Sequence, residues 1–114
     1  MKLTLPERLI LSRALLPNKG DDLELTLRRD IIKKTEISQD EYDKYEIKIA
    51  GNGMTWNDEG TKAIFDIEFT NAEKKRVATV LNEMKDKKEL SDDILDMFYK
   101  FTQEEAEKAD KKKQ

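Results

Sequence analysis

The sequence predicts an α+β domain with three N-terminal helices, a small antiparallel β-meander and a C-terminal helical hairpin. Apolar residues recur at helical spacing up to residue 45, alternate with polar residues over 45–69, and return to helical spacing over 70–101. The chain has 114 residues, which is the length of one domain. Hydrophobic residues make up 37% and charged residues 41%, so nearly every apolar side chain is needed in the core. We expect a single domain over residues 1–103.

Each of the three N-terminal helices has its own start signal. Thr4 and Glu7 have the spacing of a capping box, in which each side chain accepts a hydrogen bond from the other residue's backbone N–H. This first helix ends at the turn-forming residues 17–20. A second helix is predicted over residues 21–34, because its acidic start and lysine-rich end match the helix dipole. Residues 38–45 form a short third helix, which begins with another capping-box pattern.

The β-meander is predicted from three segments in which apolar and polar residues alternate, namely 45–49, 54–56 and 63–69. Residues 51–53 provide a glycine-rich turn between the first two strands, and residues 57–60 provide a second turn. The order of helix, helix, short helix and hairpin is that of a winged helix-turn-helix. We therefore expect winged-helix-like order with one face of the sheet buried.

Residues 70–101 are predicted to form the C-terminal helical hairpin. A capping box at Thr70 and Glu73 starts the first of its helices, and a lysine-rich hinge over 85–89 separates the two. Residues 104–114 are charged and carry no large apolar side chain. We expect this tail to fray into solvent.

The absence of cysteine and histidine excludes disulfides, thiolate nucleophiles, imidazole bases and the common zinc and haem sites. The four glycines lie in turns, so there is no glycine-rich phosphate loop, and the paired carboxylates have no accompanying motif. We therefore predict a protein that is not an enzyme and has no cofactor and no metal. No apolar run reaches the roughly 18 residues of a membrane span, so we expect no membrane partner and a cytoplasmic location.

DNA binding is one interpretation of the winged-helix-like order. The third helix would have to enter a major groove, yet residues 38–46 hold four acidic residues and one lysine. Phosphates repel such a surface, and a net charge of -3 is no basic surplus. DNA binding through this helix is therefore disfavoured.

A second route to nucleic acid uses the two ends of the helix that starts at Thr70. Acidic residues interleave with the basic ones there, so a solvated charged face is the simpler explanation. The alternative nucleic-acid contacts are Lys74, Lys75, Arg76, Lys85, Lys87 and Lys88.

An acidic and aromatic surface is the candidate protein-binding site. Acidic residues attract a basic partner, and Trp and Tyr dominate binding hot spots. An alternative role for Trp56 is to fill the space between the sheet and the helices. The candidate residues are Asp40, Glu41, Asp43, Tyr42, Tyr45 and Trp56. In the C-terminal hairpin, Phe98, Tyr99 and Phe101 crowd one end, and part of that surface is a candidate homodimer contact.

Several segments follow one another in a familiar order: Glu7-Arg8-Leu9-Ile10-Leu11, Leu15-Leu16-Pro17, Ser38 to Glu41, Trp56, and Phe69-Thr70 with Glu73. Their order resembles that of small uncharacterised proteins encoded by bacteriophages and prophages. The resemblance spans most of the chain up to Phe101. It implies a phage or prophage setting, with the cytoplasm of the bacterial host as the location, and it implies no catalytic residue.

Three functions follow from these observations. The favoured one is a non-enzymatic interaction module, a phage-encoded accessory protein that binds a host or viral protein through its acidic and aromatic surface. The alternatives are a winged-helix transcription regulator that contacts DNA through the lysines named above, and a structural component of a virion or its assembly.

Overall fold

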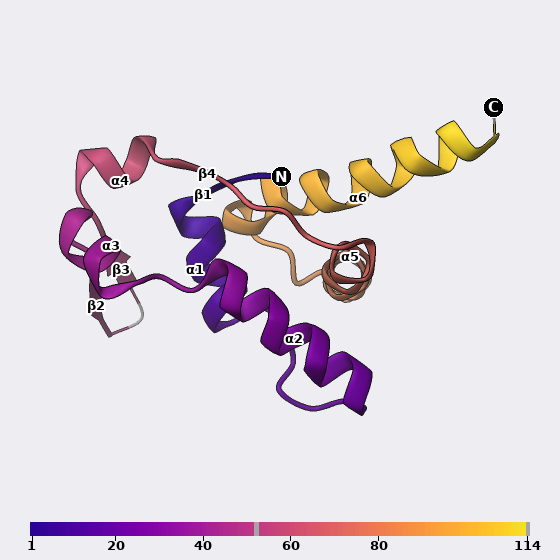
Figure 1. The fold of residues 1–114 in the computed structure, drawn as a ribbon, viewed down its shortest axis with the longest axis horizontal. Coiled ribbons are helices and arrows are strands. Elements are labelled where there is room, and N and C mark those ends of the chain that lie inside the picture. The colour runs from indigo at the N-terminus through magenta and orange to yellow at the C-terminus, as the bar shows by residue number, and fades with distance from the viewer. Residues whose placement is uncertain (52, 114) are drawn as a thin grey trace.

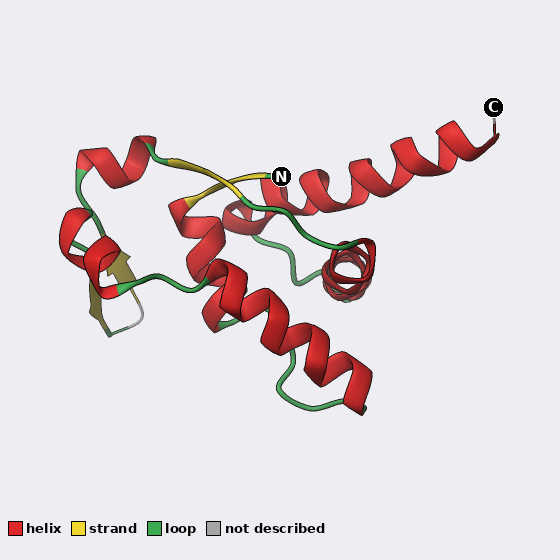
Figure 2. Cartoon of the chain, in the orientation of Figure 1, coloured by secondary structure: helices red, strands yellow, loops and turns green. Residues whose placement is uncertain are grey.

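The computed structural model describes the backbone of residues 1–51 and 53–113 and the side chains of residues 1–51 and 53–102. The elements in chain order are β1 (Lys2–Thr4), α1 (Leu5–Arg13), α2 (Asp22–Thr35), α3 (Gln39–Lys44), β2 (Lys48–Ala50), β3 (Gly53–Thr55), α4 (Asp58–Lys62), β4 (Ile64–Asp66), α5 (Asn71–Asp86) and α6 (Asp92–Lys113). Helices pack beside two small antiparallel sheets, which confirms the predicted α+β class (Figure 1, Figure 2).

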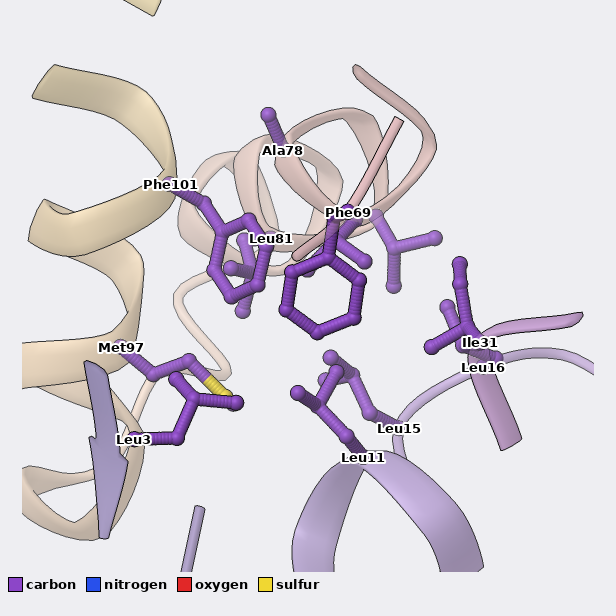
Figure 3. Close-up of a cluster of buried hydrophobic side chains, with 12 residues drawn as sticks. Leu3, Leu11, Leu15, Leu16, Ile31, Phe69, Ala78, Leu81, Met97 and Phe101 are labelled. Atoms are coloured by element: carbon purple, nitrogen blue, oxygen red, sulfur yellow. The ribbon is translucent and has the colours of Figure 1, made fainter. Parts of the chain in front are cut away.

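The main hydrophobic core lies among α1, α2, α5 and α6. The helix α1 packs against α2 and α6, and α5 packs against both α2 and α6, which confirms the C-terminal helical hairpin. Figure 3 shows the core, in which the rings of Phe69 and Phe101 lie 5.7 Å apart between centroids. Its buried members are Leu3, Leu11, Leu15, Leu16, Ile31, Phe69, Val77, Ala78, Val80, Leu81, Met97 and Phe101.

A second and smaller cluster involves a different face of α1. Leu5 and Leu9 are buried there together with Tyr45 and Ile47. The partly buried side chains that pack against this cluster are Ile37, Tyr42, Met54, Trp56, Ala63 and Phe65. Because α1 contributes to both clusters, it joins the four-helix part of the domain to the part that contains α3, the β2–β3 hairpin and α4 (Figure 1).

Four helices begin with a capping box, which confirms the three predicted boxes and adds one at the start of α2. The glutamate of each box accepts a hydrogen bond from the N-cap backbone N–H and also binds a basic side chain from another helix. The pairs are Glu7 with Lys100, Glu24 with Arg76, Glu41 with Arg8 and Glu73 with Lys34, at N···O distances of 2.6, 3.0, 2.6 and 2.6 Å. The residues that start the helices therefore also connect them.

The predicted three-stranded meander needs a correction, because its third strand pairs elsewhere. Strand β4 is antiparallel to β1 at the start of the chain, with Leu3 opposite Phe65. The pairing continues beyond β4, where the Ile67 N–H donates to the Met1 carbonyl at 2.9 Å. The hairpin of β2 and β3 therefore stays two-stranded. The sequence signal for β1 is the alternation of Met1 and Leu3 with polar residues. This alternation spans only a few residues, which is too short to predict a strand.

The segment predicted as a second turn is a helix. Asn57 is the N-cap of α4, and its side-chain oxygen accepts a hydrogen bond from the Gly60 N–H at 2.9 Å. The Asn57 side chain also donates to the Lys44 carbonyl at 3.0 Å. The predicted turn is therefore wrong, because a capping asparagine starts a short helix here and does not close a β-turn.

The predicted order of helix, helix, short helix and hairpin is present in α1, α2, α3 and β2–β3, and α3 is held by α1. Arg8 of α1 is buried and donates to Glu41 of α3 and to the carbonyls of Thr35 and Glu36 at the end of α2. The helix α3 therefore belongs to the packed structure through its N-terminal carboxylate.

The final helix α6 extends to Lys113. The side chains of residues 104–113 and all of residue 114 lie outside the described part of the chain, so the fraying of this tail stays a prediction. Across the part of the chain that the structure describes, every helix is too short or too polar to cross a membrane.

Candidate protein-binding groove

A groove of about 700 Å³ lies between the start of α1, the strand β3 with the residues after it, and the first turns of α6. Apolar and acidic side chains make up most of its lining, together with Thr4, Gly53 and Lys100. The apolar ones are Pro6, Ile10, Met54 and Trp56, and the acidic ones on α6 are Asp92, Asp93 and Asp96. The groove thus combines an apolar surface with an acidic wall.

Trp56 is oriented by its neighbours in α4. The indole Nε1 donates a hydrogen bond to the Thr61 hydroxyl at 3.2 Å. Gly60 permits the close approach, because a Cβ at that position would lie 3.1 Å from the Trp56 Cδ1 atom and 3.1 Å from Leu5. Trp56 packs against the second cluster and also lines the groove. Trp56 therefore fills part of the interior, as one of its two predicted roles requires, and its role in binding stays a prediction.

The β2–β3 hairpin extends the apolar surface beyond the groove. Met54 lies opposite Ile49 across the hairpin, and directly opposed residues place their side chains on the same face of a sheet. Met54 is partly buried, whereas Ile49 is 46% exposed. Ile49 is therefore an exposed apolar side chain on the same face of the hairpin as Met54, which lines the groove.

The acidic wall is built at the start of α6. Asp92 and Asp93 occupy its first turn, where the helix dipole stabilises negative charge, and Asp96 follows within one further turn. All three side chains are exposed. Glu7 also lines the groove, but Lys100 binds it at 2.6 Å and balances its charge. The groove lining therefore carries a net negative charge from the three aspartates.

The six residues predicted to form an acidic and aromatic surface do not lie together in one site. Glu41 is held by Arg8, and Tyr45 is only 7% exposed, so both are structural residues. Tyr42 is partly buried against the second cluster. Asp40 and Asp43 are exposed on α3 and do not line the groove. Of the six predicted residues, only Trp56 lines the groove.

The electrostatic environment of Glu41 explains why it is a structural residue. Its carboxylate accepts hydrogen bonds from the Arg8 guanidinium at 2.6 and 3.3 Å and from the Ser38 N–H at 3.1 Å. Hydrogen bonding to Arg8 is the main cause that lowers the pKa of Glu41 below its ordinary value of 4.5, against a smaller opposing effect of burial. A carboxylate that is already bound in this way has little capacity left for a partner.

The basic residues of α5 do not form one patch. Lys75 and Lys87 lie at opposite ends of the helix, about 18 Å apart at 1.5 Å per residue. Arg76 binds Glu24 at 3.0 Å, and the Lys85 ammonium lies 6.0 Å from the centroid of the Phe98 ring. Lys74 is partly buried, and Lys88 lies in the loop before α6. The six lysine and arginine side chains therefore offer no continuous basic stripe.

The aromatic residues at the end of the chain separate into core and surface. Phe101 is fully buried in the main core, which removes it from the predicted homodimer contact. Phe98 is partly buried, and Tyr99 is 46% exposed with its ring edge-on to Phe98 at 5.6 Å. Tyr99 is thus the exposed member of the predicted contact.

Asp92, Asp93, Asp96 and Ile10 belong to the groove but were absent from the predicted site. The start of a helix explains acidic residues by itself, so the sequence offered no reason to assign them a partner. Asp93 and Asp96 are three residues apart and therefore lie on one face of α6. This spacing is the only sequence signal that could have grouped them. Among the described residues, no group of three or more carboxylates is arranged to hold a metal ion.

No protein-family model, no curated protein and no solved structure matches this chain.

Proposed function

We propose that this protein is a non-enzymatic interaction module that binds another protein through the groove between α1, β3 and α6. The observation that carries the proposal is the combination of Trp56 with three exposed aspartates in one groove of about 700 Å³. Tryptophan is the residue most enriched in binding hot spots, and charges at the rim of an interface select and attract a partner.

The groove supports binding better than α3 does. The α3 surface keeps only Asp40 and Asp43 as exposed acidic side chains, and its tyrosines pack inward. In the groove, apolar and acidic groups lie side by side, so a partner can bury apolar surface and pair its charges at the same time.

The setting belongs to the same proposal. The resemblance to proteins of bacteriophages and prophages supports a phage-encoded accessory protein that acts in the cytoplasm of a bacterial host. Its partner is then a host or viral protein. The scattered lysines of α5 give a regulator that binds DNA less support.

Capture of a partner by charge variants tests the groove. The tagged full chain is used to capture proteins from a bacterial lysate, together with two double variants. Asp93→Lys with Asp96→Lys reverses the groove wall, and Asp40→Lys with Asp43→Lys makes the same change in charge on α3. We expect one specific protein with the wild type and the α3 variant, and its loss with the groove variant.

Three results would contradict the proposal. Loss of the captured partner with the α3 variant alone would place the binding site on α3. Equal capture by all three proteins would remove both acidic surfaces as the binding site. Recovery of nucleic acid without a specific protein would favour the DNA-binding regulator. Circular dichroism of each variant checks that it is folded.

A further inference from the structure

We infer that the groove recognises an arginine-bearing segment with an aliphatic side chain beside the arginine. This inference rests on the proposed function and names the chemistry of the partner. The argument uses the charge of the groove, its aromatic side chain and a contact inside the protein itself.

Charge complementarity sets the sign of the partner. The exposed carboxylates of Asp92, Asp93 and Asp96 line one side of the groove, and Lys100 is already bound to Glu7. A cationic segment can therefore pair with solvent-exposed carboxylates. It does not need to displace the ion pair between Lys100 and Glu7. An anionic segment would meet repulsion at the same wall.

The aromatic and apolar residues distinguish among cations. A guanidinium group is planar, stacks on an aromatic face and binds carboxylates through two parallel hydrogen bonds, whereas an ammonium group acts as a hydrated point charge. Trp56 and the aspartates line the same groove, so an arginine-bearing segment bound there meets both kinds of contact. Met54 and Ile10 offer apolar surface for a neighbouring aliphatic side chain.

The protein already uses this combination internally. The Arg8 guanidinium lies 4.3 Å from the centroid of the Phe65 ring. The same group donates two hydrogen bonds to the carboxylate of Glu41, at 2.6 and 3.3 Å. The groove presents the same pair of chemical groups, an aromatic ring and carboxylates, without an arginine of the groove's own lining.

A peptide series tests the inference, and Trp56 reports binding because it is the only tryptophan of the chain. The full-length protein is titrated with acetyl-Leu-Arg-Leu-Arg-amide while the tryptophan emission is recorded. We expect a saturable shift that weakens as salt is added. Replacing both arginines by lysine is expected to weaken binding at least about threefold, and replacing them by neutral citrulline at least about tenfold.

Two protein variants locate the binding. The groove variant, Asp93→Lys with Asp96→Lys, is expected to lose the response to the arginine peptide. The α3 variant, Asp40→Lys with Asp43→Lys, is expected to keep it. Retention by the groove variant would overturn the inference.

Other outcomes separate the inference from the proposed function. Equal affinity for the arginine and lysine peptides would overturn the inference and leave the groove as a general site for cations. A groove-dependent partner in the lysate together with no response to the arginine peptide would also overturn it, while the proposed function stands. Self-association that the groove variant abolishes and the arginine peptide fails to inhibit would make a second copy the occupant.

Discussion

Arg8 donates a hydrogen bond from Nη1 to the Glu41 carboxylate at 2.6 Å, and this contact fixes α3 against α1. The same guanidinium donates to the carbonyl of Glu36 at 2.8 Å and to that of Thr35 at 3.3 Å. Its Cζ atom lies over the Phe65 ring, 4.3 Å from the ring centroid. Arg8 is only 6% exposed, so one buried cation connects α1, the end of α2, α3 and β4.

Replacing Arg8 by alanine is expected to destabilise the protein strongly. The change leaves the Glu41 carboxylate without its cation and the carbonyls of Thr35 and Glu36 without their donor. Because the Glu41 side chain is 27% exposed, the loss is expected to lie below the roughly 3–5 kcal/mol of a fully buried pair. Urea denaturation measures the free energy of unfolding. Arg13→Ala, on the exposed end of the same helix, is the control and should stay within about 0.5 kcal/mol of wild type.

The pH dependence of stability should carry a contribution from Glu41. Its pKa in the folded protein is lowered, chiefly by hydrogen bonding to Arg8. The unfolded chain therefore binds protons more readily, and the stabilisation is present above the ordinary pKa of 4.5 and disappears as the pH falls through the folded value. Glu41→Gln should lose less stability than wild type when denaturation is compared at about pH 6 and about pH 3. Parallel losses in the two proteins would contradict this assignment.

A glycine at position 88 should stabilise the loop between α5 and α6. Lys88 has a φ of 60°, in the left-handed region that favours glycine. It follows the C-cap Lys87 in a Schellman motif, in which the Glu89 N–H donates to the Met84 carbonyl at 2.8 Å. We expect Lys88→Gly to raise the free energy of unfolding by about 0.5–1 kcal/mol. Lys87→Gly removes the same charge at a φ of -86° and should give no gain in the same denaturation experiment.

Phe101 and Tyr99 should respond very differently to truncation. Phe101 is fully buried and packs on Phe69, so Phe101→Ala is expected to cost about 3–5 kcal/mol. Tyr99 is 46% exposed on the same helix, and Tyr99→Ala should cost less than about 1 kcal/mol. Thermal or urea unfolding of the two variants makes the comparison. Similar losses in the two variants would contradict the burial of Phe101 and the exposure of Tyr99.

Helix starts were predictable because their signals are local. Thr4 with Glu7, Ser38 with Glu41 and Thr70 with Glu73 are each three residues apart, and all three boxes form as predicted. A capping box satisfies backbone N–H groups within one helical turn, so it needs no distant partner. Each glutamate also forms an ion pair with a residue of another helix. The sequence could not predict these pairs, because each partner lies far along the chain.

Strand pairing and the groove were not predictable in the same way. The alternation around Phe65 indicates a strand, but nothing near it in sequence indicates that Leu3 lies opposite. Likewise, the residue type of Trp56 made it a candidate binding residue. The helix dipole at the start of α6 already explains Asp93 and Asp96, so the sequence did not mark them as groove residues.

The amino-acid sequence by itself therefore determined the α+β class, the starts of α1, α2, α3, α5 and α6, and the exclusion of cysteine and histidine chemistry. These properties depend on composition and on contacts within a few residues. The tertiary structure alone decided that β4 joins β1, that Glu41 is bound by Arg8, and that Trp56 shares a groove with the aspartates of α6. Each of these pairings joins segments far apart along the chain, and packing of the whole domain selects among many partners of similar chemistry.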